Sequence, residues 1–326
     1  MVWLITGGAG YIGSHVADAF LRGGLQVVAI DNLSTGRRDF VPDGAIFVEG
    51  SVEDRNLLEK IFANHHVDGV IHLAGFKFAG ESVNNPLITY TNNTTTTAIL
   101  LQAMVNHGVR TLVFSSSCSV YGDTGEAHVD ESFALNPTSP YGNSKLAAEL
   151  LIRGCAKAFD ISHTSLRYFN VIGTRLSKVV DLSPHNIIPA VHGALLAGRP
   201  PQINGDDYDT FDGTCVRDYI DVGELADAHF YAALRIIAGD RLEPVYNLGS
   251  ETGVSVRQIV DTALSVSGVH DKPIIGPRRS GDPDSIVAKS DLARRDLGWK
   301  AMTAFNVSIA NDWVERQNNL QLREED

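Results

Sequence analysis

A tyrosine and a lysine in the segment SPYGNSK, at residues 139–145, are four residues apart, which is about one helical turn. Tyr141 and Lys145 would therefore project from the same face of a helix. A phenol ionises at about pH 10, too high for a base at neutral pH, but a neighbouring ammonium favours the phenolate and lowers its pKa. Such a pair could exchange a proton with a substrate hydroxyl. The alternative is the exposed start of an ordinary amphipathic helix behind Pro140.

A glycine-rich turn near the start of the chain points to a dinucleotide. Gly8, Gly10 and Gly13 of ITGGAGYIGSH have G-x-G-x-x-G spacing, Gly7 adds a second match, and Asp31 ends the next strand pattern 18 residues later. Glycines let the backbone approach a pyrophosphate, and a helix N-terminus offers it free N–H groups. Asp31 would accept both ribose hydroxyls and repel a 2′-phosphate, so the sequence predicts NAD rather than NADP. The alternative is a structural turn followed by an unrelated acid.

Three serines complete the reactive set. Ser115, Ser116 and Ser117 of FSSSCSVYG end a predicted strand, about two dozen residues before Tyr141. In a doubly wound sheet, ligands gather beyond the carboxyl ends of the strands, so these serines are expected near the cofactor. Ser117 would hydrogen-bond the substrate oxygen that Tyr141 deprotonates, and the positive nicotinamide ring would add to the Lys145 ammonium in lowering the pKa of the phenol.

Strand and helix patterns alternate in the first half of the chain. The predicted strands are residues 2–6, 26–31, 45–50, 67–74 and 110–116, and the predicted helices are about 11–23, 53–64, 92–107 and 140–158. This alternation predicts an α/β fold with a doubly wound parallel (Rossmann) sheet. We expect residues 1–169 to form the NAD-binding domain, with 215–248 returning to it. Residues 170–326 would mainly form a smaller C-terminal α+β substrate lobe.

The composition of the chain limits the kinds of binding partner that are expected. The 326 residues carry a net charge of −12 with no basic cluster, so nucleic acid and anionic membranes are poor partners. The three cysteines, Cys118, Cys155 and Cys215, have neither metal-ligand nor disulfide-framework spacing, which suits a reducing cytoplasm. The chain opens directly in a strand pattern, so we expect no signal peptide, and no apolar run has membrane-spanning length. We expect no metal.

Nine segments in this order resemble the UDP-galactose (UDP-glucose) 4-epimerase family of the extended short-chain dehydrogenase/reductase superfamily. They are TGGAGYIGSH, DNLSTG, HLAGFKFAGES, SSSCSVYG, SPYGNSK, LRYFN, DGTCVRDYI, YNLG and PRRSGD. The resemblance covers nearly the whole chain. It implies that Ser117, Tyr141 and Lys145 are the catalytic residues.

The resemblance also implies two sets of binding residues. The NAD site would comprise Gly7, Gly10, Tyr11, Ile12, Gly13, Asp31, Asn32, Leu33, Ser34, Thr35, Gly36, Ser51, Val52, Leu73, Ala74, Gly75, Lys77, Asn92, Ser115, Tyr141, Lys145 and Phe169. The UDP-sugar site would comprise Lys77, Ser117, Tyr141, Asn170, Asn186, Ile187, Gln202, Ile203, Asn204, Arg217, Arg279, Asp282 and Ile286. Two arginines near a diphosphate make physical sense, because a guanidinium matches phosphate oxygens in shape and charge.

The implied reaction is an NAD-dependent inversion at C4 of a UDP-hexose, as used in galactose metabolism. Bound NAD takes hydride from C4, the 4-keto sugar turns over while its diphosphate stays anchored, and hydride returns to the other face. UDP supplies remote binding energy for a loosely held sugar. The resemblance further implies a homodimer through the apolar faces of helices 92–107 and 140–158, which the sequence does not separate from core packing.

Alternatives remain for the substrate. A UDP-N-acetylhexosamine is open because Ile286, where the family has its size-selecting residue, is neither a bulky Tyr nor a small Cys or Ser. A UDP-uronate is open because Arg175 or Arg199 could pair with its carboxylate. A sugar-nucleotide dehydratase would need a Thr-Asp-Glu pattern where Ser117 to Ser119 stand, so we set it aside. A non-catalytic NAD-sensing protein would typically lose Tyr141 or Lys145.

The chain departs from the family's pattern at three places. Ser51 stands where an Asp usually contacts adenine, and Thr96 replaces a glycine in a helix expected to pack closely. The segment 171–186 is shorter and lacks the usual Gly-Glu pattern. His185 in this segment is expected to be structural, because no partner spacing supports a chemical role.

Overall fold

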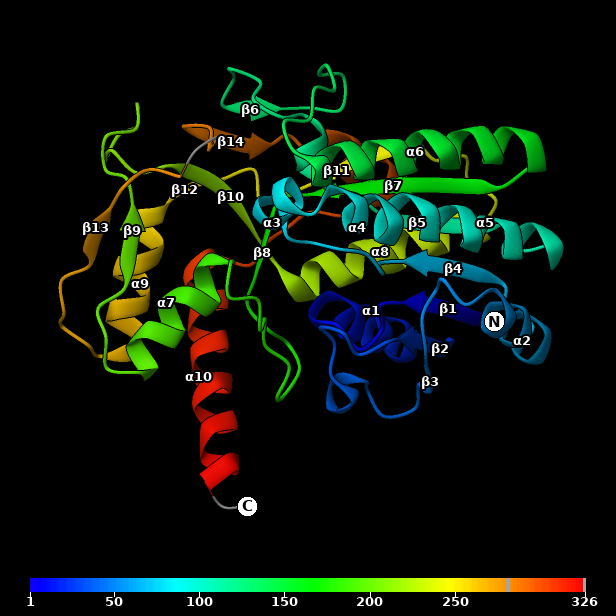
Figure 1. The fold of residues 1–326 in the computed structure, drawn as a ribbon, viewed down its shortest axis with the longest axis horizontal. Coiled ribbons are helices and arrows are strands. Elements are labelled where there is room, and N and C mark those ends of the chain that lie inside the picture. Colours follow the sequence, from blue (N-terminus) through cyan, green and yellow to red (C-terminus); the bar gives the residue numbers. More distant parts are fainter. Residues whose placement is uncertain (280–281, 325–326) are drawn as a thin grey trace.

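Seven parallel strands form the main sheet in the computed structural model, which describes residues 1–279 and 282–324 (Figure 1). The strands are β1 (Val2–Thr6), β2 (Gln26–Asp31), β3 (Ile46–Glu49), β4 (Gly69–His72), β5 (Thr111–Ser115), β7 (Ser162–Tyr168) and β11 (Val245–Leu248). Their order is β11-β7-β5-β4-β1-β2-β3. The chain thus winds outward from β1 in both directions, which confirms the predicted doubly wound parallel sheet.

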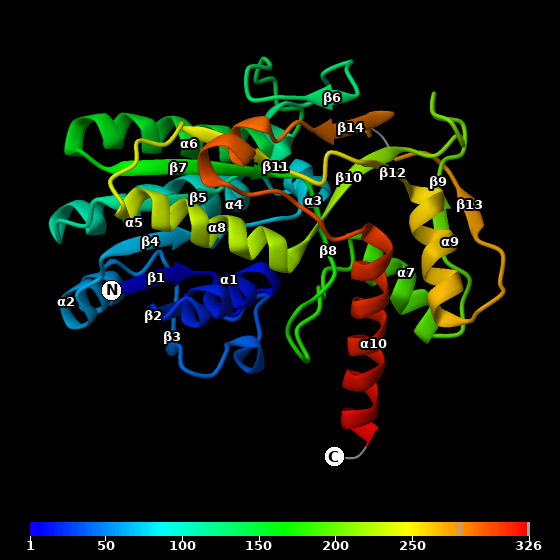
Figure 2. The ribbon, with the colours of Figure 1, turned by 180° about the vertical axis from the view of Figure 1, so that it is seen from behind.

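Helices cover both faces of this sheet because alternate side chains of a strand point to opposite faces. Trp3 and Ile5 of β1 pack with α1 (Tyr11–Arg22) and α8 (Val222–Ile237). Leu4, between them, packs with α2 (Arg55–His65), α5 (Thr96–Asn106) and α6 (Pro140–Phe159). All three side chains are fully buried. Figure 2 shows α1 beside α8 on the first of these faces.

The strands and helices predicted in the first half are all present, and their ends differ from the predicted ones by up to two residues. The helix predicted over 92–107 is not α-helical throughout. It begins with a π-helical turn, η2 (Thr91–Thr95), and continues as α5. The hydroxyls of Thr96 and Thr97 donate to the carbonyls of Asn92 and Asn93, four residues back. Such bonds compete with the regular helical pattern.

Two small sheets are built mainly from the second half of the chain. Their strands are β6 (His128–Val129), β8 (Asn170–Ile172), β9 (Gln202–Asn204), β10 (Val216–Asp221), β12 (Gly253–Ser255), β13 (Ile274–Gly276) and β14 (Ser285–Ala288). The larger sheet has the order β12-β10-β14-β6, with β8 also paired to β10, and β13 pairs with β9.

Residues 215–248 are divided between the main sheet and the second sheet. Strand β10 lies in the second sheet, so the prediction that this stretch returns to the main sheet is wrong for β10. Helix α8 packs on the main sheet and β11 extends its edge beside β7. An apolar run predicts a strand but not the sheet that it joins, because partner choice depends on packing far away in sequence.

Three helices pack together at the end of the molecule away from the N-terminus (Figures 1 and 2). They are α7 (Ile187–Leu196), α9 (Val256–Ser267) and α10 (Phe305–Glu324), and their cluster includes Val191, Ile259 and Trp313. The remaining helices are short: η1 (Arg38–Phe40), α3 (Ala79–Asn84), α4 (Pro86–Tyr90), η3 (Cys118–Val120) and η4 (Ala293–Leu297). Within residues 1–279 and 282–324, no helix has the length and apolar character needed to span a bilayer.

Candidate functional site

A cavity of about 1000 Å³ lies between the carboxyl ends of the main strands and the second half of the chain. Predicted cofactor residues that line it are Gly7, Gly10, Tyr11, Ile12, Gly13, Asp31, Asn32, Ser34, Thr35, Ser51, Val52, Leu73, Ala74, Gly75, Lys77, Asn92, Tyr141, Lys145 and Phe169. Predicted substrate residues that line it are Lys77, Ser117, Tyr141, Asn170, Asn186, Ile187, Gln202, Asn204, Arg217, Arg279 and Asp282. The fold therefore brings residues from both predicted sets to one continuous space.

Five predicted site residues do not line the cavity. The Ser115 hydroxyl instead bonds His229 at 2.8 Å. Ile203 is fully buried in the cluster of α7, α9 and α10, and Ile286 packs in a separate cluster that includes Phe169. Leu33 and Gly36 belong to the turn after β2, where Leu33 has a φ of +57°.

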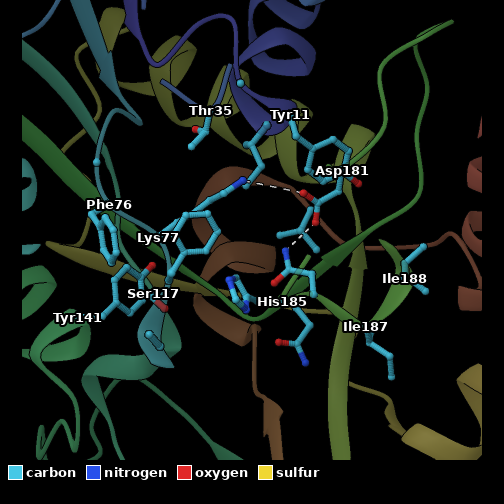
Figure 3. Close-up of a pocket in the computed structure, with 18 of the residues that line it drawn as sticks. Tyr11, Thr35, Phe76, Lys77, Ser117, Tyr141, Asp181, His185, Ile187 and Ile188 are labelled. Carbon is cyan, nitrogen blue, oxygen red and sulfur yellow. Dashed lines mark hydrogen bonds and ion pairs between the residues drawn. The ribbon is translucent and has the colours of Figure 1, made fainter. Parts of the chain in front are cut away.

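Several cavity residues were not predicted as binding residues, among them Phe76, Phe78 and Asp181, and His185, which was expected to be structural, also lines the cavity. In Figure 3, Lys77 faces Asp181. The two phenylalanines flank Lys77 in the sequence, so their place beside a predicted binding residue was a usable signal. Asp181 and His185 lie in the divergent segment 171–186, where no recurring spacing marks them.

The glycine turn forms a close cradle between β1 and α1. A Cβ at Gly13 would lie 2.0 Å from the Gly7 carbonyl oxygen, and one at Gly7, whose φ is +71°, would lie 2.9 Å from the Ala74 nitrogen. Only glycine fits these positions, so the backbone lines the cavity directly. Helix α1 begins at Tyr11, and the first N–H groups of a helix have no intrahelical acceptor. These groups fit a pyrophosphate.

Asp31 stands at the end of β2 and also borders the cavity. Its carboxylate accepts hydrogen bonds from the backbone N–H groups of Ala9 at 3.1 Å and Leu33 at 2.8 Å. Burial raises the pKa of Asp31, and the two hydrogen bonds oppose the shift. A carboxylate has about four acceptor sites, so acceptor capacity remains for the two hydroxyls of a ribose. The turn and this acid together fit a dinucleotide such as NAD.

Helix α6 positions the tyrosine and lysine through its first turn. The Ser139 hydroxyl caps it by accepting from the Gly142 N–H at 3.2 Å, and Pro140 occupies the first helical position. A Cβ at Gly142 would lie 2.4 Å from the Ser119 carbonyl oxygen, so glycine lets this turn approach the serine loop. Tyr141 and Lys145 therefore face the ends of the main strands and are both buried.

The Lys145 ammonium is directed at the end of β5. Its Nζ donates to the Ser115 carbonyl oxygen at 3.0 Å and lies 5.0 Å from the centre of the Phe114 ring. Burial lowers the pKa of Lys145 to about 8, and Glu149, one turn further along α6, opposes the shift. Glu149 is itself fixed by Arg167 through hydrogen bonds of 2.9 and 2.6 Å, and both side chains are buried.

The pKa of the Tyr141 phenol is not lowered in the chain by itself, so the predicted lowering, which included the positive nicotinamide ring, stays a prediction for the NAD-bound protein. Burial raises the pKa of Tyr141 to about 12, a hydrogen bond with Ser117 opposes the shift, and Cys118 adds to it. Lys145 Nζ lies 6.0 Å from the centre of the Tyr141 ring and is bonded to Ser115 instead. Desolvation therefore outweighs the ammonium, and the phenol holds its proton.

A buried asparagine ties the segment around Lys77 to α6. Asn93 accepts from the Phe76 N–H at 2.7 Å, and its amide group donates to the Phe76 carbonyl at 3.1 Å and to the Ser144 hydroxyl at 2.8 Å. A Cβ at Gly75 would lie 2.5 Å from the Asn93 Oδ1 atom. This contact holds the wall that carries Lys77 against the helix that carries Tyr141.

The other end of the cavity is suited to an anion. Arg217 of β10 is largely buried, and its Nη1 donates to the Val216 carbonyl at 2.8 Å. Its buried Nη2 has no hydrogen-bond acceptor among the described residues and lies 3.6 Å from Asp282 Oδ1. Arg199 and Arg279 line the same cavity. A buried guanidinium with an unused donor fits a phosphate oxygen.

One residue considered for a uronate carboxylate lies elsewhere. Arg175 does not line the cavity, and it pairs with Asp227 at 2.7 Å and lies 3.8 Å from Asp221. Arg199 does line it. Of the two arginines, only Arg199 is placed to meet a ligand in this space.

The sheet, the glycine cradle and the buried tyrosine–lysine turn define a dinucleotide-dependent enzyme of the extended short-chain dehydrogenase type. Residues 3–249 match the NAD dependent epimerase/dehydratase family. The chain is 41% identical over 304 residues to the UDP-glucose 4-epimerase of Halalkalibacterium halodurans, covering 92% of this chain and 90% of that one. The chain belongs to the NAD dependent epimerase/dehydratase family, which confirms the resemblance seen in the sequence.

Solved structures agree with this assignment. A crystal structure of a UDP-glucose 4-epimerase has a TM-score of 0.94 at 36% identity, covering 98% of each chain. The UDP-glucose-4-epimerase of Stenotrophomonas maltophila, solved with bound NAD and formylated UDP-arabinopyranose, has a TM-score of 0.92 at 35% identity, covering 99% of each chain.

Replacing Gly13 by Ala is expected to abolish NAD binding, because the new Cβ would lie 2.0 Å from the Gly7 carbonyl oxygen and push the cradle apart. Overpacking of this kind typically costs about 1–3 kcal/mol of stability. Bound NAD per chain and the free energy of unfolding measure the two effects. Gly154→Ala is the control, because a Cβ there meets nothing within 4 Å. Normal NAD content in Gly13→Ala would contradict the cradle.

The ionisation of Lys145 predicts a pH-dependent stability in the nucleotide-free protein. The pKa of Lys145 falls from 10.5 to about 8 on burial, so between these values the unfolded chain holds a proton that the folded chain has released. The free energy of unfolding should therefore gain a contribution from Lys145 as the pH rises through this window. Urea unfolding of wild type and Lys145→Met should show the difference growing in favour of wild type. A constant difference would contradict the low pKa.

Proposed function

We propose that this protein is a UDP-hexose 4-epimerase that interconverts UDP-glucose and UDP-galactose. Family membership and the full-length similarity to UDP-glucose 4-epimerases support this activity. The observation that carries it is the single cavity, in which the glycine cradle, the buried Tyr141 and the buried Arg217 occur together. NAD is the cofactor, and when bound it accepts and returns a hydride and brings a positively charged ring.

Tyr141 is the proposed acid–base at the sugar. With NAD bound, its phenolate form would take the proton of the C4 hydroxyl and become the phenol, and it would return this proton to the C4 oxygen when the keto group is reduced again. Ser117 lines the same cavity and opposes the raised pKa of this phenol, and it would share the same substrate oxygen. Lys145 would hold the nicotinamide ribose and, with the added positive charge of the cofactor, stabilise the phenolate.

The substrate is anchored at its diphosphate. Arg217 and Arg279 would contact the phosphate oxygens, while Asn186, Gln202 and Asn204 line the neighbouring cavity wall. Firm binding of UDP leaves the sugar free to present either face of the 4-keto intermediate. Because the diphosphate is fixed and the sugar is mobile, hydride can return to the opposite face of C4, which inverts this carbon.

A homodimer and a cytoplasmic location belong to the same proposal. Helix α4 packs beside α6 and exposes Leu87 and Ile88, whose exposed fractions are 82% and 53%, while α6 exposes Leu150 at 56%. These side chains support a dimer through α4 and α6, whereas the apolar residues of α5 are mostly buried in the core. Cys118, Cys155 and Cys215 are free thiols, which supports a reducing compartment.

The purified protein should convert UDP-galactose to UDP-glucose, and Tyr141→Phe should lose most of this turnover while keeping NAD. General acid–base catalysis contributes about 10²–10⁴-fold, so the loss should be of that order. Separate incubations with UDP-galactose, UDP-N-acetylgalactosamine and UDP-galacturonate, with the products resolved, measure substrate choice. Conversion of only the acetamido sugar or only the uronate would replace the proposed substrate. Conversion of none would refute the epimerase, and full turnover in Tyr141→Phe would exclude the phenol as acid–base.

A further inference from the structure

The segment 173–186, here called the substrate loop, leads from β8 to α7 and reaches the cavity at its end. Its first residue is held from the cofactor side, where the Tyr11 hydroxyl donates to the Gly173 carbonyl at 2.5 Å. The rest of the loop is held from a different direction, by the C-terminal helix α10. The proposed mechanism gives no role to that helix.

Four residues of α10 spaced at helical turns form one polar face. They are Asp312, Glu315, Arg316 and Asn319. The Lys178 N–H donates to Glu315 at 3.0 Å, and Asn319 donates to the Lys178 carbonyl at 3.1 Å. Arg316 Nη2 donates to the Asp181 carbonyl at 2.6 Å. All three hydrogen bonds involve main-chain atoms of the substrate loop, at Lys178 and Asp181. Helix α10 therefore fixes the path of the loop backbone.

Arg316 is itself held in place. Its Nε donates to Asp312 Oδ1 at 2.5 Å, and its Nη2 donates to Asp312 Oδ2 at 3.3 Å. His192 Nδ1 of α7 lies 2.7 Å from the same Oδ1 atom. His192 and Asp312 are completely or almost completely buried. A buried carboxylate between two partners has little freedom to move, so Arg316 presents its outer nitrogen to the loop in one direction.

The Asp181 side chain points from this anchor into the cavity. It accepts from the Asn186 amide at 2.6 Å and lies 3.9 Å from Lys77 Nζ. Figure 3 shows the contact between Asp181 and Lys77. Asp181 is almost fully buried. Asn186 and Lys77 both line the cavity, so the Asp181 carboxylate contacts two residues that can meet a ligand there.

We propose that Arg316, backed by Asp312, is a positioning residue for substrate binding. By fixing the main chain at Asp181, Arg316 directs the Asp181 carboxylate toward Asn186 and Lys77, and so sets where these two groups meet the nucleotide sugar. Arg316 does not line the cavity, so it acts only through Asp181. The inference rests on the proposed function for the identity of the ligand, a UDP-sugar.

The test compares Arg316→Met with Arg22→Met in the full chain with its NAD. Arg22 is a matched control, because it also pairs with an aspartate one turn away, Asp18, but on the exposed surface of α1. The measurements are KM and kcat with UDP-galactose, the Kd of UDP by calorimetry, and bound NAD per chain. Because one charge-assisted hydrogen bond is lost, KM and the Kd of UDP should rise about tenfold in Arg316→Met. The kcat and NAD content should stay near wild type, and Arg22→Met should change nothing.

Asp181→Ala and the double variant with Arg316→Met test the route. If Arg316 acts through Asp181, the double variant should bind UDP no more weakly than Asp181→Ala alone. The proposal would be overturned if the loss of UDP affinity in the double variant equalled the product of the losses in the two single variants. An unchanged Kd of UDP in Asp181→Ala would also overturn it. If Arg316→Met does not fold, Arg316→Lys replaces it, with the same expected rise and the same control.

Two further outcomes would also refute the proposal: an unchanged KM and Kd in Arg316→Met, or a loss of NAD in step with the loss of UDP affinity. Failure of the epimerase proposal is distinguishable, because it would leave the wild type without turnover on UDP-galactose. The UDP titration needs no turnover and still reports on Arg316 in that case.

Discussion

Burial of an ammonium and a phenol on one turn of α6 is the constraint on which the site depends. Desolvation opposes both ionised forms, lowering the pKa of Lys145 to about 8 and raising that of Tyr141 to about 12. The chain alone stabilises the ammonium through the Ser115 carbonyl and Glu149. For the phenol, only the Ser117 hydroxyl opposes the rise of the pKa. Its proton therefore becomes available only when further positive charge enters the cavity, which couples acid–base chemistry to the presence of NAD.

The rest of the fold holds this pair and the ligand anchors at fixed relative positions. Parallel strands end at one edge, where the glycine cradle, Asp31 and the serine loop meet. Asn93 joins the wall that carries Lys77 to α6, and the buried Glu149–Arg167 pair joins α6 to β7. Breaking such a buried pair leaves an uncompensated charge, which typically costs about 3–5 kcal/mol. The same interactions that stabilise the core therefore also fix the reactive groups.

Structure is best predicted from the sequence where a short segment determines its own conformation. The glycine cradle, the cap of α6 and the main strands are of this kind, and the doubly wound sheet follows from their alternation. Contacts that depend on distant packing were not predictable. Strand β10 reads as a return to the main sheet but pairs with β8, β12 and β14, and Asp181 gains its surroundings only because α10 folds back across the chain. The burial that raises the pKa of Tyr141 in the nucleotide-free chain was not predictable either, because spacing predicts a neighbour but not its burial.

The most direct measurement is the pKa of Tyr141, followed by NMR of ¹³C-labelled tyrosine in nucleotide-free and NAD-loaded protein, with Tyr141→Phe to assign the signal. The account predicts a pKa of about 12 without nucleotide. With NAD bound it predicts a decrease of at least roughly two units, the size expected from a nearby opposite charge. An equal pKa in both states would contradict the account, because the phenol would then gain nothing from the cofactor beside it.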